Sequence, residues 1–199
     1  MNDQWLKRWE EGRISFHEGS PNDLLIKHFS SFKLGPTCLV PLCGKAVDMF
    51  WLAEQGQKVT GVELSEIAIR QFYEEHPTSM EMNLQLHHSD FFKFTSPQTF
   101  SWIYDRAALI ALPEMTRKTY VAHQKTMLQD IASIILLSVE YASTELKGPP
   151  FSVSDNEVYA LYSFAKNIHA IESRDPINST PHLRHQLQWI RETLWKIDV

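Results

Sequence analysis

Apolar positions in this chain follow two different spacings, and segments of the two kinds alternate along the sequence. Residues 38–40 form a short apolar run that is typical of a strand, whereas apolar side chains over 47–52 recur at helical spacing. Gly56 follows, where a residue in the left-handed conformation commonly ends a helix. A second strand over 58–62 completes the pattern. This order predicts a βαβ unit with two parallel, neighbouring strands and a right-handed crossover.

The same two spacings predict the remaining elements. Residues 131–141 are apolar in their middle, as expected for a central strand that is buried on both faces. Further strands are expected over 83–88, 100–104, 167–173 and 188–197, and helices over 2–11, 21–32, 66–75, 107–112, 113–128 and 156–165. Strands that alternate with helices favour an α/β doubly wound sheet with helices on both faces. The last two strands follow one another without a helix, which predicts an antiparallel edge.

Three of the expected helices begin at recognisable capping residues. Ser20 is the expected N-cap of the helix over 21–32, with Pro21 at its first position, where proline is tolerated. Ser65 precedes the helix over 66–75, and Ser154 precedes the helix over 156–165.

The loop after the first strand and the end of the second strand carry candidate chemistry. In a parallel sheet the ligand crevice lies beyond the carboxyl ends of the strands, where both Gly44 and Glu63 fall. A loop that enters a helix offers free backbone N–H groups, and an acid about 20 residues later can accept hydrogen bonds from ribose hydroxyls. Because the loop holds one glycine, a dinucleotide is disfavoured and S-adenosylmethionine is favoured. The alternative is a purely structural βαβ unit with a solvated Glu63.

Composition narrows the class of protein. The 199 residues are 43% hydrophobic, enough for one core, and we expect a single domain over 1–199. A net charge of -5 argues against a nucleic-acid partner. No apolar run approaches the length of a membrane span, and the charged start does not resemble a secretory signal. Without a secretory signal, Cys38 and Cys43 are expected to be reduced thiols in a cytoplasmic protein. A monomer is expected because no long exposed apolar seam is evident, and the nine histidines form no ligand-spaced cluster that would suggest a metal site.

Three segments resemble one known family. The runs VPLCGKAVDMFWLAEQGQKVTGVELS, YDRAALIALP and GPPFSVSDNEV are similar to the thiopurine S-methyltransferases, and the resemblance covers essentially the whole chain. It implies a class I S-adenosylmethionine-dependent methyltransferase with a seven-stranded sheet, mostly parallel with an antiparallel last strand. It also implies transfer of a methyl group to the sulfur of a small-molecule thiol, and a helical cover over the cofactor cleft formed by residues 1–36.

The resemblance also assigns cofactor-binding residues. Trp9 matches the tryptophan that packs over the cofactor, and Leu42 matches the first-loop residue. Glu63 matches the acid that binds the ribose, while Ser89 and Asp90 match the pair that flanks the adenine. Asp90 could equally begin a turn.

Three residues are expected on the acceptor side. Arg106 matches an arginine next to the methionyl end and the acceptor, where it would position both electrostatically as the catalytic residue. Its alternative role is a structural ion pair with Asp105 or Glu140. Phe16 matches an aromatic residue of the substrate pocket, and Phe151 is a candidate wall of it.

The chemistry of methyl transfer makes few demands on side chains. A sulfonium cation and a thiolate anion lose their charges in an in-line displacement, so a dry, apolar pocket favours the reaction. Because the thiolate is itself the nucleophile, no general base is expected. The alternatives are an enzyme that methylates halide or inorganic selenium or tellurium, a non-catalytic nucleoside-binding module, and a nicotinamide-dependent oxidoreductase.

Overall fold

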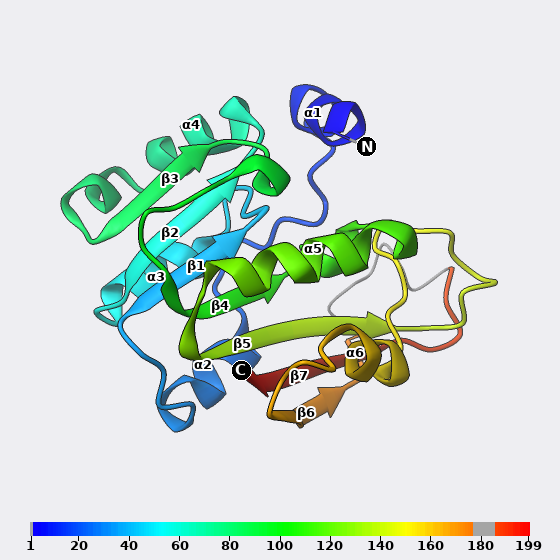
Figure 1. Ribbon diagram of the computed structural model, residues 1–199. Coiled ribbons are helices and arrows are strands. Elements are labelled where there is room, and N and C mark those ends of the chain that lie inside the picture. Colours follow the sequence, from blue (N-terminus) through cyan, green and yellow to red (C-terminus); the bar gives the residue numbers. More distant parts are fainter. Residues whose placement is uncertain (1, 177–185) are drawn as a thin grey trace. The chain divides into compact units, whose positions relative to one another are not determined.

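The computed structural model describes residues 2–176 and 186–199 of the chain (Figure 1). The contacts between residues divide it into two compact units, Met1–Ile103 and Tyr104–Val199, called here the N-terminal and C-terminal units. The boundary falls inside strand β4 (Phe100–Arg106).

The strands form a seven-stranded sheet in the order β3-β2-β1-β4-β5-β7-β6. Strand β1 pairs in parallel with β2 and β4, and β2 pairs in parallel with β3. Strand β7 is antiparallel to both β5 and β6. The remaining bounds are β1 Thr37–Pro41, β2 Lys58–Glu63, β3 Leu84–His88, β5 Leu128–Glu140, β6 Asn167–Arg174 and β7 Arg191–Asp198. The expected mostly parallel sheet with an antiparallel last strand is therefore confirmed.

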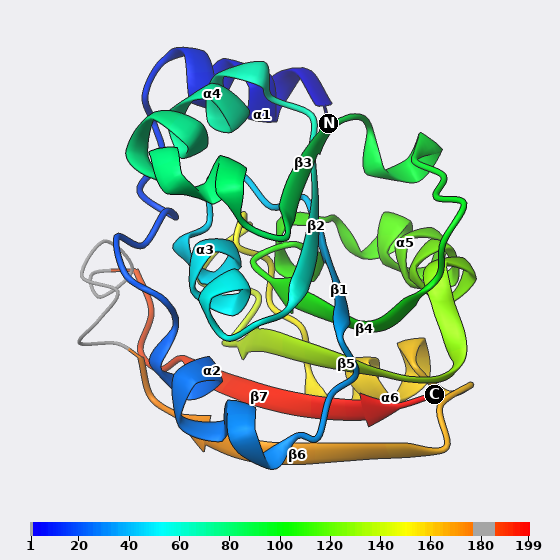
Figure 2. The same cartoon turned by 90° about the vertical axis from the view of Figure 1, so that its left-hand side faces the viewer.

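In the N-terminal unit, two helices connect the parallel strands. Their bounds, with those of the two helices that precede β1, are α1 Asn2–Glu10, α2 Asp23–His28, α3 Val47–Glu54 and α4 Glu66–Glu75. Helices α3 and α4 both pack against β2 and β3, and Figure 2 shows them on the same side of these strands. Strands β1, β2 and β3 are neighbours in chain order, and each connection between them is a right-handed crossover. Two such crossovers in the same direction place both helices on the same face of the sheet.

The start of α2 differs from the sequence-based expectation. Asn22, rather than Ser20, is the N-cap, and its side-chain oxygen accepts hydrogen bonds from the backbone N–H groups of Leu24 and Leu25. The backbone N–H of Asn22 donates in turn to Asp48 Oδ1 at 2.7 Å. This contact with α3 is long-range in sequence, so it was not visible to local reasoning. Helix α2 ends at His28 and is followed by a short 3-10 helix, Phe29–Ser31.

Other helix ends are as predicted. Gly56 has φ +83°, the left-handed conformation expected after α3. The Ser65 side chain accepts from the backbone N–H of Ala68 at the start of α4, and the Ser154 side chain caps α6 (Asp155–Leu161) in the same way.

The C-terminal unit consists of a long strand, an antiparallel pair and two main helices. Helix α5 (Glu114–Met127) runs directly into β5, which therefore begins earlier than expected. Figures 1 and 2 show α5 and α6 on the same face of β5, β7 and β6. The expected 107–112 helix is a short 3-10 helix, Leu109–Ala111. The core of this unit includes the fully buried side chains of Ile134, Leu136, Tyr162, Leu194 and Trp195.

The last strand of the chain begins later than the sequence predicts. The predicted strand over 188–197 is observed as Arg191–Asp198, and most of the expected loop before it, residues 177–185, lies outside the described residues. Within the described ranges, no helix has both the length and the apolar character that crossing a membrane requires.

Candidate active site

The loop that leaves β1 turns sharply back toward β2. Leu42 and Gly44 both have positive φ angles, +46° and +53°. The backbone N–H of Cys43 donates to the carbonyl oxygen of Val62 at 3.1 Å. This hydrogen bond holds the first loop against the end of β2, next to Glu63.

Glu63 fastens the same loop through its side chain. It is 8% exposed, and its Oε2 accepts a hydrogen bond from Gly44 N at 2.8 Å while its Oε1 accepts from Ser65 N at 2.7 Å. Burial raises the pKa of the Glu63 carboxyl group, and the backbone N–H groups of Ser65, Gly44 and Leu64 oppose that shift. The hydrogen bonds from Gly44 and Ser65 occupy one acceptor position on each oxygen, so the carboxylate keeps acceptor capacity for a hydroxyl donor of a ligand.

Trp9 covers this loop from helix α1. Its indole is 5% exposed, and a Cβ atom on Gly44 would lie 3.1 Å from Trp9 Cζ2. The ring of Phe16 meets the ring of Trp9 edge-on, with centroids 5.7 Å apart, and meets Trp5 in the same way at 5.5 Å. The N-terminal unit thus brings together Trp9, Phe16, the first loop and Glu63.

Ser89 and Asp90 lie directly after β3. The backbone N–H of Ser89 donates to the carbonyl oxygen of Glu63 at 2.9 Å, so this segment also reaches the end of β2. Asp90 caps a short 3-10 helix, Phe91–Lys93, because its Oδ1 accepts from Phe92 N at 3.0 Å. The turn-forming role expected as an alternative for Asp90 is therefore present.

In the C-terminal unit, Asp105 is the centre of a buried polar network. Its Oδ1 accepts from Leu109 N at 3.0 Å, and its Oδ2 accepts from Tyr120 Oη at 2.8 Å and Gln124 Nε2 at 2.7 Å. Tyr162 Oη extends the network by donating to Gln124 Oε1 at 3.1 Å. Burial raises the pKa of the Asp105 carboxyl group, which these donors partly offset.

Arg106 follows Asp105 at the carboxyl end of β4. The next residue, Ala107, has φ +60°, and the hydrogen bond from Leu109 N to Asp105 fixes the turn that carries Arg106. Glu140, one ion-pair partner considered for Arg106, forms an ion pair with Arg191. Asp105 is the second partner considered for Arg106. Its carboxylate accepts hydrogen bonds from the backbone of Leu109 and from the side chains of Tyr120 and Gln124.

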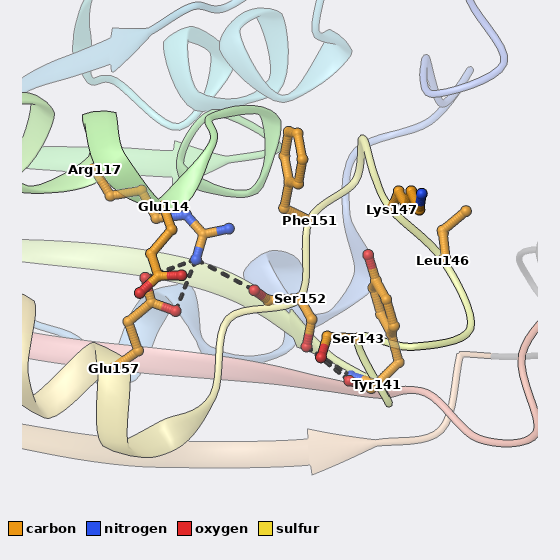
Figure 3. A pocket seen from close by; sticks show the side chains of 9 residues that line it. All are labelled: Glu114, Arg117, Tyr141, Ser143, Leu146, Lys147, Phe151, Ser152 and Glu157. Atoms are coloured by element: carbon orange, nitrogen blue, oxygen red, sulfur yellow. Dashed lines mark hydrogen bonds and ion pairs between the residues drawn. The ribbon is translucent and has the colours of Figure 1, made fainter.

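Phe151 lines a cavity of about 240 Å³ that lies wholly within the C-terminal unit (Figure 3). Its backbone N–H donates to the carbonyl oxygen of Ile110 at 2.7 Å. The preceding turn needs a glycine at position 148, because φ is +73° and a Cβ atom would lie 2.4 Å from the Phe151 ring. The other residues around the cavity are Glu114, Arg117, Tyr141, Ser143, Leu146, Lys147, Ser152 and Glu157.

Two residues at this cavity were missed by the sequence-based reasoning. Arg117 lies in α5 and is only 2% exposed, and Tyr141, which follows β5, is also buried. The helical spacing of Arg117 with the buried residues Tyr120, Val121 and Gln124 could have placed it on the inward face. A charged residue at such a position needs partners, and that makes it a candidate for function.

The family model of the thiopurine S-methyltransferases matches residues 1–198. The chain belongs to this family. That membership confirms the predicted enzyme class, an S-adenosylmethionine-dependent methyltransferase. Most of the chain also matches individual thiopurine S-methyltransferases. The protein of Marinobacter nauticus is 38% identical over 92% of this chain and 90% of its own length. That of Bordetella pertussis is 39% identical over 90% and 89%.

Solved structures of other methyltransferases share the fold. The 1,6-didemethyltoxoflavin-N1-methyltransferase of Burkholderia thailandensis, with bound S-adenosylhomocysteine, has a TM-score of 0.70 at 15% identity and covers 98% of this chain and 86% of its own. The magnesium protoporphyrin IX methyltransferase of Synechocystis PCC 6803 has a TM-score of 0.66 at 12% identity, with 98% and 95% covered. At such identities the likeness shows a common fold alone, a Rossmann-like methyltransferase fold.

Proposed function

We propose that the protein transfers the methyl group of S-adenosylmethionine to the sulfur of a thiopurine or another small aromatic or heterocyclic thiol. The observation that carries this proposal is the Glu63 carboxylate, which holds the first loop through Gly44 N at 2.8 Å beneath the Trp9 indole. This arrangement brings an aromatic ring, a buried carboxylate and a tight loop together at the carboxyl ends of β1 and β2. Those are the features that a nucleoside needs.

The cofactor-binding residues are proposed as follows. Glu63 accepts the ribose hydroxyls with its remaining acceptor capacity, and Trp9 packs over the cofactor. Leu42, whose positive φ shapes the first loop, lies along the ligand. Ser89 and Asp90 flank the adenine, supported by the hydrogen bond between Ser89 N and the Glu63 carbonyl oxygen.

The acceptor side is assigned to Arg106, Phe16 and Phe151. Arg106 positions the methionyl carboxylate or an anionic acceptor as a bidentate donor. The aromatic rings of Phe16 and Phe151 provide apolar surroundings, which favour a reaction in which a sulfonium and a thiolate both lose their charge. Catalysis then rests on positioning in line rather than on a general base.

The test is methyl transfer from labelled S-adenosylmethionine to a panel of acceptors. The panel contains a thiopurine, aliphatic and aromatic thiols, iodide, selenite and tellurite. Label on the thiopurine or an aromatic thiol supports the proposal. Label confined to iodide, selenite or tellurite indicates the alternative acceptor class. If no acceptor is labelled although S-adenosylhomocysteine raises the melting temperature, the protein is a nucleoside-binding module and the proposed transfer is wrong.

We further propose that the protein is cytoplasmic and monomeric. Residues 1–199 form one methyltransferase domain, in which residues 1–36 cover the cofactor. We propose no nucleic-acid partner. The net charge of -5 supports the last point. Sedimentation equilibrium tests the oligomeric state. A mass twice that of the chain would contradict the monomer.

A further inference from the structure

The cavity in the C-terminal unit contains a buried cation whose hydrogen-bonding capacity is only partly used. Arg117 Nε donates to the carbonyl oxygen of Leu112 at 2.9 Å. Its Nη1 donates to the carbonyl oxygen of Ser152 at 3.2 Å and to both carboxylate oxygens of Glu157, at 2.6 and 2.7 Å. The second terminal nitrogen, Nη2, has no hydrogen-bond partner among the described residues. Guanidinium groups carry five N–H donors, so two remain available here.

The free nitrogen points into the part of the cavity where an aromatic ring lies. Figure 3 shows Arg117 Nη1 directed at Glu157, while Nη2 points away from it, to the side of the Phe151 ring. The centre of the guanidinium is 6.0 Å from the centroid of that ring. The Tyr141 ring also lines the cavity. A donor pair beside one aromatic ring, in a cavity that a second ring also lines, is suited to a planar ligand that carries a hydrogen-bond acceptor.

The structural duties of Arg117 do not require Nη2. The bonds to Leu112, Ser152 and Glu157 already connect α5, α6 and the segment that carries Phe151, and they use Nε and Nη1 alone. Arg117 Nη2 is not among the fully enclosed polar atoms of the described residues, so it is accessible from the cavity and can donate to a ligand that supplies an acceptor. Because Glu157 balances the charge of Arg117, the acceptor need not be an anion.

The cavity has the size of a small ring compound. Its volume of about 240 Å³ lies below the range of about 300–1,000 Å³ that is typical of sites for drug-sized ligands. The cavity also adjoins the end of β5, since Tyr141 directly follows that strand, and ligands of doubly wound sheets bind beyond the carboxyl ends of the strands.

We propose that this cavity holds the ring of the methyl acceptor and that Arg117 Nη2 donates a hydrogen bond to an acceptor group on that ring. The inference rests on the proposed methyl transfer to aromatic thiols. It makes Arg117 a specificity-determining residue that selects rings with a carbonyl, carboxylate or similar acceptor over plain aromatic rings.

The test compares three thiols of one shape. Thiophenol lacks the acceptor group, 4-mercaptobenzamide carries a neutral one and 4-mercaptobenzoate carries an anionic one. We expect the wild-type protein to favour both substituted thiols in kcat/KM. In Arg117→Lys, which retains a cation for Glu157 but lacks the second terminal nitrogen, that preference should fall by about tenfold or more. Arg174→Lys, which alters an ion pair with Glu192 away from the cavity, is the matched control and should retain the preference.

A merely structural Arg117 gives a different result. The melting temperature would then fall, and kcat/KM would decrease by the same factor for all three thiols, which would overturn the inference. A wild-type protein that shows no preference for the substituted thiols would overturn it as well. If only 4-mercaptobenzoate is favoured, and the preference persists in Arg117→Lys, then charge rather than this donor selects the ring, and the inference is wrong.

Binding of the methylated products separates this inference from the proposed reaction. Calorimetry measures the affinities for thioanisole and 4-(methylthio)benzamide with S-adenosylhomocysteine present, and it needs no turnover. If no thiol is methylated, but 4-(methylthio)benzamide binds more tightly and this advantage disappears in Arg117→Lys, then the cavity is a ligand site and the proposed reaction fails. If the two products bind equally in the wild-type protein, the inference fails, whatever the activity.

Discussion

Replacing Glu63 by glutamine tests the carboxylate that holds the first loop. In the structure each carboxylate oxygen accepts one backbone N–H, from Gly44 at 2.8 Å and from Ser65 at 2.7 Å. A carboxamide has one oxygen, so one of these two N–H groups would face an NH₂ group and lose its acceptor.

The size of the effect follows from the burial of the site. Glu63 is 8% exposed, so water does not replace the missing acceptor. A hydrogen bond to a charged group contributes about 1.5–3 kcal/mol, and the loss should weaken cofactor binding by about 10- to 100-fold. Part of the lost affinity comes from the weakened hydrogen bonds to the first loop, and part comes from the lost contact with the ribose hydroxyls. The assay has to separate these two contributions.

Calorimetry with two ligands makes that separation. One ligand is S-adenosylhomocysteine and the other is its 2′,3′-dideoxy analogue, which lacks the hydroxyl groups that Glu63 is proposed to accept. In the wild-type protein we expect the analogue to bind more weakly. In Glu63→Gln the difference between the two ligands should shrink, because the side chain no longer accepts from both hydroxyls.

Glu66→Gln is the control, since Glu66 is an exposed acid in the first turn of α4. It should leave both affinities unchanged. An equal loss for both ligands in Glu63→Gln would refute the ribose contact and leave Glu63 with a loop-holding role alone. If Glu63→Gln binds both ligands as tightly as the wild-type protein does, then the hydrogen bonds from Glu63 to the first loop do not contribute to cofactor binding either.

Three further changes test other parts of the structure. Arg106→Ala should lower methyl transfer without changing the melting temperature; retained activity with reduced stability would favour a structural role. Gly44→Ala should destabilise the first loop by about 1–2 kcal/mol, because φ is +53° and the new Cβ would press on Trp9, and urea unfolding with S-adenosylhomocysteine titration measures this. Asp105→Asn should change how stability depends on pH. The folded-state pKa of Asp105 is raised above its ordinary 3.8, so its contribution is complete below 3.8 and is lost as pH rises through the folded pKa. The free energy of unfolding of the variant relative to wild type should therefore rise with pH from about 4 upward, and a flat difference would contradict this.

Much of the fold followed from local pattern. The strand, helix and strand over 38–62 were predicted from spacing, and Gly56, Ser65 and Ser154 marked helix ends because their conformations or caps are local properties. The start of α2 was predicted wrongly, since the hydrogen bond from Asn22 N to Asp48 depends on how two distant helices meet.

The candidate site was predictable to a smaller degree. The position of Glu63 beside the first loop followed from the parallel pairing of two strands, but its hydrogen bond to Gly44 N depends on their register, in which Pro41 lies opposite Val62. Arg117 escaped notice because the helical spacing that places it on the inward face of α5 does not show which partners it meets there. Its role became visible only with the bonds to Ser152 and Glu157.

The order in which the strands pair has a consequence for biosynthesis. Strand β7 supplies the hydrogen-bonding partner of both β5 and β6, and Val199 N donates to the carbonyl oxygen of Ala132. Chains emerge from the ribosome from the N-terminus at about 5–20 residues per second, so the strands of the N-terminal unit can pair during synthesis. The edge of β5 and the edge of β6 that pair with β7 have no partner strand until Arg191–Asp198 have left the exit tunnel. A nascent chain of this protein therefore exposes these two strand edges until β7 is available, which is when a chaperone has most to protect.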